Sequence, residues 1–284
     1  MTRAEIASVA KRLVKAKIET TRIGGLVKRS PLWEWLRPRR FQVYCVGAPK
    51  TGTTSIARLF SRDYRAEHEP GASALVDAIS AVADGAMSAD ELGRFLRRRD
   101  RDFRWELESS HLIAAFAGEL VELFPAAKFI LTVRDVRSWL DSLINHQINV
   151  RARPNYPRYW RALSDLYHLR PGQRFQPTER ELAAAGLYPL DGYLSFWREH
   201  HERILRAVPE HRLLLVRTAD ITARAADIAR FVGAPPTTLD TAASHANVAP
   251  VKHGVVARID QAFLEARIRH HCQPIWSRCC AQLA

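Results

Sequence analysis

The feature that most constrains this chain is a glycine-containing turn that joins an expected strand to an expected helix. An apolar run over residues 41–46 favours a buried strand, and Ile56, Leu59 and Phe60 have the spacing of a buried helix face. The turn between them, residues 47–55, contains two glycines, one lysine and four hydroxyl side chains. Backbone N–H groups and the positive end of the helix dipole converge in such a turn, which is an arrangement that binds phosphate. We therefore predict an anion site at this turn.

Beyond the turn, strands and helices alternate along the chain. We expect strands at residues 41–47, 64–68, 103–108, 128–133 and 212–217, and an Ala-rich helical stretch over 72–97 that breaks near Gly85. This alternation predicts an α/β protein of three layers, a mostly parallel sheet with helices on both faces. A chain of 284 residues can form one large domain of this kind, which we place at residues 41–284 after a helical extension and connector at 1–40.

The position of Lys50 separates two kinds of phosphate site. In a Walker A loop, GxxxxGK[ST], the lysine directly follows the second glycine and reaches the β- and γ-phosphates of a nucleotide. Gly47 and Gly52 have the Walker A spacing, but Thr53 follows the second glycine and Lys50 stands two residues before it. A P-loop phosphotransferase would lack its central cation here. This class is the alternative enzyme function for the loop.

Two segments together resemble the sulfotransferases, which bind 3′-phosphoadenosine 5′-phosphosulfate (PAPS). Residues 49–54, Pro-Lys-Thr-Gly-Thr-Thr, resemble their 5′-phosphosulfate loop. The strand expected at 128–133 ends in Arg134, and Ser142 follows eight residues later in an expected helix. In sulfotransferases an Arg and a Ser at this spacing hold the 3′-phosphate, which needs a charge-assisted fork and a hydroxyl donor. The likeness extends over about residues 41–236.

The resemblance implies a P-loop NTPase-like sulfotransferase fold and transfer of a sulfuryl group from PAPS to a hydroxyl or amine, with PAP as the product. It implies no metal, and it makes Lys50 the group that stabilises the leaving oxygen. The donor-binding residues that it implies are Pro49, Lys50, Thr51, Gly52, Thr53, Thr54, Ser55, Arg134 and Ser142. Ser55 departs from the cytosolic enzymes, which carry a Trp there for adenine stacking. A non-catalytic module that binds PAP or another anion is the alternative outside the enzymes.

The base that removes the acceptor's proton has several candidates. The run Glu67–Gly71 resembles the GEP segment of bacterial carbohydrate sulfotransferases, whose Glu is considered the base, and we favour Glu69. Pro70 disfavours helical backbone at Glu69, so we expect an extended turn there. The run Glu108–Leu112 resembles the Thr-His-Leu of cytosolic enzymes, which makes His111 the second candidate. The remaining candidates are His68 and Glu108.

The region 148–187 is rich in aromatic residues and proline and has weak periodicity, so we expect a lid or an acceptor-binding insertion. Residues 251–254 resemble a late loop of the family that closes over the 3′-phosphate.

We expect the pairs His200-His201 and His270-His271 to be solvated. Cys45 should be a buried strand residue, and the four cysteines lack the spacing of a zinc site.

Charge is concentrated at the start of the chain. Residues 1–40 hold eleven Lys or Arg against three Asp or Glu, which is +8 of the net +13. We expect a helix over residues 1–29 that packs on the body or on a second copy in a homodimer, or that contacts an anionic membrane surface. No apolar run approaches a membrane span of about 20 residues, and we expect a cytoplasmic protein. The predicted acceptor is a small molecule, a lipid or a glycan, and the mildly basic body does not indicate nucleic acid.

Overall fold

The computed structural model describes residues 38–154, 156–244 and 250–283. The expected helix over 1–29 therefore lies outside the described residues. The chain divides into two compact units at Arg40, and the unit Phe41–Ala284 carries all the elements described below. No helix in these described ranges has the length and apolarity needed to cross a membrane.

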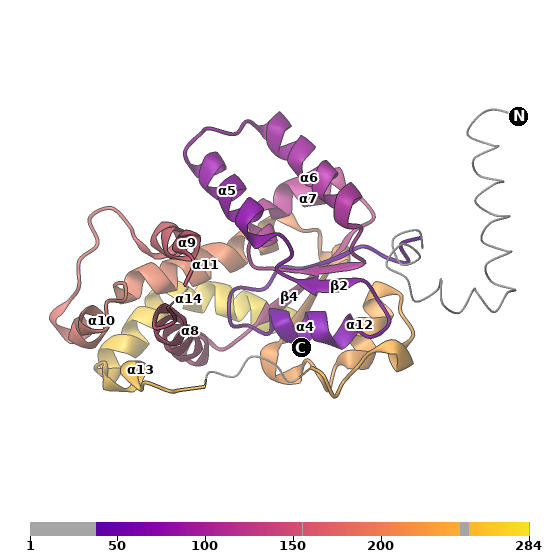
Figure 1. Ribbon diagram of the computed structural model, residues 1–284. Helices are drawn as coiled ribbons and strands as arrows, with labels where there is room; N and C mark the ends of the chain where they lie inside the picture. The colour runs from indigo at the N-terminus through magenta and orange to yellow at the C-terminus, as the bar shows by residue number, and fades with distance from the viewer. Residues whose placement is uncertain (1–37, 155, 245–249, 284) are drawn as a thin grey trace, which may run out of the picture. The chain divides into compact units, whose positions relative to one another are not determined.

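The centre of the unit is a sheet of five parallel strands in the order β2-β3-β1-β4-β5 (Figure 1). The strands are β1 (Val43–Cys45), β2 (Ala66–His68), β3 (Leu107–Ser109), β4 (Lys128–Val133) and β5 (Leu213–Arg217). From β1 the chain crosses to β2 and β3 on one side and then returns to β4 and β5 on the other. The predicted α/β fold with a parallel sheet is confirmed.

Helices cover both faces of the sheet because alternate strand residues point to opposite sides. Val43 and Cys45 join the core formed with α4 (Thr53–Phe60) and α12 (Ala225–Val232). Tyr44 joins the larger core on the other face. That core includes residues of α7 (Ala117–Leu123), α11 (Leu190–Ala207) and α14 (Gln261–Leu283). Figure 1 shows α4 and α12 below the sheet and α6 and α7 above it.

The remaining α-helices are α5 (Ala72–Ala83), α6 (Ala89–Phe103), α8 (Val136–Arg151), α9 (Arg158–His168), α10 (Arg180–Ala184) and α13 (Val255–Arg258). The expected break near Gly85 lies between α5 and α6. The strand expected at 103–108 begins later in the structure, at Leu107, because α6 continues to Phe103. A capping box between Ser88 and Glu91 begins α6, and the helix continues past the expected end at residue 97 to a turn that buries Arg99.

The region 148–187 contains more regular structure than its weak periodicity indicated. Helix α9 begins after Pro157, and α10 follows before α11. In α9, Trp160, Leu163 and Tyr167 recur at helical spacing. The prolines that flank this helix obscured its pattern in the sequence.

The expectation of solvated histidine pairs is wrong for His200 and His201. Both are buried in α11, where His200 Nε2 contacts the Val46 carbonyl at 2.8 Å and His201 Nδ1 contacts the Trp197 carbonyl at 2.7 Å. Helix α11 packs against α7, α9 and α14 and contributes to the larger core, so the charged residues around these histidines do not indicate exposure. His271 of the second pair is also mostly buried and contacts Asp191 at 3.1 Å.

Candidate active site

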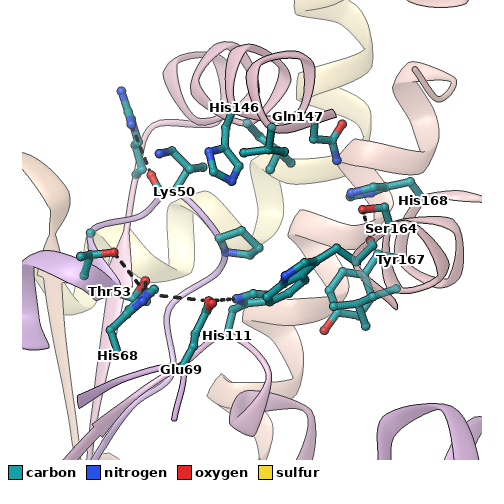
Figure 2. A pocket seen from close by; sticks show the side chains of 18 of the residues that line it. Lys50, Thr53, His68, Glu69, His111, His146, Gln147, Ser164, Tyr167 and His168 are labelled. Carbon is teal, nitrogen blue, oxygen red and sulfur yellow. Dashed lines mark hydrogen bonds and ion pairs between the residues drawn. The ribbon is translucent and has the colours of Figure 1, made fainter. Parts of the chain in front are cut away.

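The residues predicted from the sequence meet at the carboxyl edge of the sheet. In an open parallel sheet, ligands bind outside the carboxyl ends of the strands where the strand order reverses, which here is at β1. A cavity of about 430 Å³ opens at this edge (Figure 2). The predicted residues that line it are Pro49, Lys50, Gly52, Thr53, Thr54, Ser55, His68, Glu69, His111 and Arg134.

The turn after β1 has the backbone of an anion cradle. Gly47 has no room for a side chain, because a Cβ there would overlap the Thr132 hydroxyl. Gly52 adopts φ 101° and Lys50 φ 66°, both in the left-handed region. Helix α4 then begins at Thr53 without a side-chain cap. The N–H groups of an uncapped first turn, together with the helix dipole, attract an anion to this end of the cavity.

Two cationic side chains flank the turn. Arg134 Nη1 donates to the Lys50 carbonyl at 3.3 Å, which fixes the guanidinium beside the loop. Trp139 Nε1 donates to the Pro49 carbonyl at 2.8 Å and ties the loop to α8. Burial, and then the charge of Arg134, lowers the pKa of Lys50 to about 8. Because each cation raises the cost of the other, an anion bound between them would relieve both.

Two predicted donor residues lie outside this cavity. The Thr51 hydroxyl donates to the Ala48 carbonyl at 2.7 Å and lies 2.8 Å from the Thr132 hydroxyl, so it braces the loop from inside. Ser142 lies on α8 and does not line the cavity. Arg134 Nε donates instead to Ser138 Oγ at 2.8 Å, one turn before Ser142. The roles of Thr51 and Ser142 in donor binding stay predictions.

A chain of polar contacts crosses the cavity floor from α4 to β3. His68 Nε2 lies 3.1 Å from Thr53 Oγ1 and 3.2 Å from Thr54 Oγ1. The same nitrogen lies 3.7 Å from Glu69 Oε1, and His111 Nδ1 lies 2.7 Å from that oxygen. Figure 2 shows the line from Thr53 through His68 and Glu69 to His111. Two of the predicted bases are therefore hydrogen-bonded to each other.

The backbone of Glu69 differs from the extended turn that we expected. Its φ is 54°, in the left-handed region, while its N–H donates to the Ser109 carbonyl at 3.0 Å. That bond and the contact with His111 hold the residue in this strained conformation, and such strain is common at functional sites. Burial raises the pKa of Glu69, but the charge and hydrogen bond of His111 outweigh it, so the net shift is downward. Glu69 is therefore ionised at neutral pH.

The structure does not bring Glu108, a further candidate base, to the cavity. Its carboxylate is buried and accepts from Arg99 Nη2 at 2.7 Å, and neither residue lines the cavity. Burial raises the pKa of Glu108, and the charge of Arg99 opposes that shift. This pair is structural.

Several lining residues were not identified from the sequence. They are Thr218 after β5, and His146, Gln147, Ser164, Tyr167 and His168 from α8 and α9. Thr218 Oγ1 donates to the Thr51 carbonyl at 2.6 Å and so joins β5 to the loop. The residues on α8 and α9 recur at helical spacing. Extending the expected helix after Arg134 would have placed His146 and Gln147 on the same face as Leu143. Tyr156, Pro157 and Trp160, which the sequence had singled out as aromatic or proline residues of 148–187, also line the cavity.

The loop at residues 251–254 packs on α8 and does not line this cavity. His253 N donates to Asn145 Oδ1 at 2.6 Å, and Asn149 Nδ2 donates to the Val251 carbonyl at 2.9 Å. Its predicted role over the 3′-phosphate is not tested by this arrangement.

The fold and the site thus define an α/β protein with an anion site at the carboxyl edge of a parallel sheet. A family model described as a sulfotransferase domain matches residues 42–236. The chain therefore belongs to the sulfotransferase-domain family. A curated relative, the Ava biosynthesis cluster protein M of Aspergillus versicolor, is 34% identical over 107 residues, which span 35% of this chain and 39% of that protein.

Solved structures of sulfotransferases are also similar. One from Alicyclobacillus acidocaldarius has a TM-score of 0.44 and 16% identity over 85% of this chain and 100% of its own. The sulfotransferase domain from the curacin biosynthetic pathway has a TM-score of 0.41 and 14% identity over 86% and 99%. A sulfotransferase from Mycobacterium avium has a TM-score of 0.42 and 15% identity over 90% and 80%.

Proposed function

We propose that this sulfotransferase takes its sulfuryl group from PAPS and transfers it to a hydroxyl or amine of a small acceptor. The observation that carries the proposal is the pairing of two sites in one cavity. Lys50, Arg134 and the uncapped start of α4 form a cationic end. The hydrogen-bonded pair Glu69–His111 lies across from it in the same cavity.

The cationic end fits the donor. PAPS, when bound, supplies a sulfuryl group already activated as a phosphosulfate anhydride. The first turn of α4 and the hydroxyls of Thr53 and Thr54 would hold its 5′-phosphosulfate, and Lys50 Nζ would stabilise the charge that develops on the leaving oxygen. Arg134 would hold the 3′-phosphate, with Ser138 or the predicted Ser142 as a hydroxyl donor.

Glu69 and His111 supply the base. As the acceptor oxygen or nitrogen bonds to sulfur, its proton must leave, and this pair lies where a proton can be accepted. The 2.7 Å contact allows His111 Nδ1–H to donate to the carboxylate, which leaves Nε2 as a proton acceptor. The carboxylate itself is the other candidate, and the two are separated experimentally below.

Calorimetric titration tests the donor. PAP should bind the purified protein at micromolar concentrations without a divalent metal, whereas ATP with Mg²⁺ should bind at least tenfold more weakly. A preference for ATP that appears only with Mg²⁺ would favour the P-loop phosphotransferase instead. A non-catalytic module would also bind PAP, but substitution of Glu69 or His111 would then have no consequence. Turnover measured on variants of these two residues therefore distinguishes it.

A further inference from the structure

The cavity extends well beyond the groups that would hold the donor. Its second half lies between α8 and α9, away from the sheet. Figure 2 shows Thr53 and His68 at one end and Gln147, Ser164 and His168 at the other. The apolar and aromatic side chains of α8 and α9 that line it are Leu143, Val150, Trp160, Leu163 and Tyr167. A molecule that reaches from the base to the far end must therefore present apolar surface along its length.

Aromatic rings next to the base form a rigid wall. The Trp160 ring stacks on the His111 ring, with centroids 5.9 Å apart and planes 27° apart. The Tyr167 ring meets His111 edge-on at 6.1 Å and stacks on Phe196 at 4.6 Å. Because these rings support one another, they offer a preformed surface for a flat ligand. The surface begins at the group that would accept the proton.

The charges of the second half argue against an acidic acceptor. Burial lowers the pKa of His146 to about 4 and that of His168 to about 3, so both imidazoles are neutral at pH 7. The cation that the described residues contribute to this half is Arg153, which is exposed. A carboxylated or sulfated glycan would therefore enter this half without a buried cationic partner.

The far end carries neutral polar groups. Gln147 Oε1 accepts from Tyr193 Oη at 2.6 Å, which fixes the amide and leaves its NH₂ group as a donor. Ser164 Oγ donates to the Trp160 carbonyl at 2.8 Å and can still accept. His168 Nδ1 is buried, and no hydrogen bond joins it to another of the described residues. A hydroxyl or carbonyl on a ligand would supply partners that this end now lacks.

We infer that the acceptor is an uncharged, flat aromatic alcohol with a second hydrogen-bonding group at its far end; this inference rests on the proposed function. The aromatic hydroxyl lies at Glu69–His111, the ring packs against Trp160 and Tyr167, and the second group reaches Gln147. In the transfer, the aryl oxygen bonds to sulfur while the bond from sulfur to the phosphate oxygen breaks. That oxygen keeps the electron pair, and the proton of the aromatic hydroxyl passes to the Glu69–His111 pair.

Ligand-observed NMR on the full chain tests this class, with three uncharged or anionic compounds titrated with and without saturating PAP. We expect 2,6-dihydroxynaphthalene to bind more tightly than 2-naphthol, and a sulfated disaccharide not to bind. Trp160→Ala should weaken 2-naphthol about tenfold and leave PAP affinity within twofold. Leu166→Ala is the matched control, because Leu166 lies on α9 with 39% exposure and does not line this cavity. Trp160→Phe should keep 2-naphthol within about threefold, which separates loss of the ring from loss of the fold.

The outcomes distinguish this inference from the proposed function. Retained PAP binding with no aromatic binding, or binding of the sulfated disaccharide instead, would overturn the acceptor class alone. Equal losses in Trp160→Ala and Leu166→Ala would also overturn it. Absence of PAP binding to the unmodified protein would overturn the proposed function and, with it, the role of the aromatic alcohol as acceptor.

Discussion

At the scale of single residues, Glu69 and His111 are in contact, so these two candidates for the base cannot be considered separately. The sequence offers them as alternatives, on separate resemblances, because 42 positions of chain divide them. In the structure they share a 2.7 Å hydrogen bond at the ends of β2 and β3, which are adjacent strands. Pairing of this kind depends on strand order, which local sequence patterns do not contain.

Substitution of the two residues separates their roles. If His111 Nε2 accepts the proton and Glu69 orients the ring, His111→Gln should lower kcat by about 10²–10⁴-fold, the usual range for a positioned acid or base. Glu69→Gln should then lower kcat less, because the amide can still contact the ring and orient it. A larger loss of kcat in Glu69→Gln than in His111→Gln would make the carboxylate the base.

Lys50 predicts a pH dependence of donor binding. Burial lowers its pKa to about 8, so the ammonium loses its proton, and with it the positive charge, as the pH rises through that value. PAP affinity should therefore fall between pH 7 and pH 9.5, by about tenfold if one cation contact is lost. Lys50→Arg is the control, because a guanidinium keeps its charge over this range. A fall of the same size in Lys50→Arg would show that another group is responsible.

At the scale of elements, the turn between β1 and α4 shows what could be predicted from the sequence. The glycines, the lysine and the hydroxyls fixed the place of the turn, and the structure confirms the strand before it and the helix after it. The direction of each side chain could not be predicted. Thr51 and Thr53 are two residues apart, yet one hydroxyl braces the interior and the other faces the cavity.

Substitution of Gly47 tests whether the turn leaves no room for a side chain. Gly47→Ala should destabilise the protein by about 1–3 kcal/mol, because the added methyl group would overlap Thr132 in a packed interior. The measurement is the midpoint of urea unfolding. Gly93→Ala on α6 is the matched control, since nothing lies within 4 Å of the added carbon, and helix propensity predicts a gain of about 0.5–1 kcal/mol. Equal midpoints for the two variants would contradict the account of the turn.

Helices α8 and α9 show the limit of sequence-based prediction. The stretch after Arg134 is expected to be helical, and helical spacing places His146 and Gln147 on the face that carries Leu143, but the sequence does not indicate that this face borders the cavity. In the same way, the aromatic residues of 148–187 were visible as a group. Which side chains they contact could not be predicted. The stacking of the Trp160 ring on the His111 ring, for example, joins elements that are far apart in the chain.

At the scale of the whole molecule, the parallel order β2-β3-β1-β4-β5 explains why residues from five separate stretches form one site. Each strand ends at the same edge, so the order of the strands decides which side chains become neighbours. The cations after β1 and β4 meet on one side of the cavity, and the carboxylate and imidazole after β2 and β3 meet on the other. This separation of charge is what suits the cavity to hold an anionic donor beside a base.

The central claim is that the cationic side of the cavity recognises the 3′-phosphate of PAP through Arg134. The most direct measurement is a calorimetric cycle with two ligands, PAP and 5′-AMP, which differ by that phosphate, and two proteins, the unmodified chain and Arg134→Ala. We predict that PAP binds the unmodified chain at least tenfold more tightly than 5′-AMP, and that this preference is nearly lost in Arg134→Ala while 5′-AMP affinity changes little. A preference for PAP that persists in the variant, or no preference in the unmodified chain, would contradict the account.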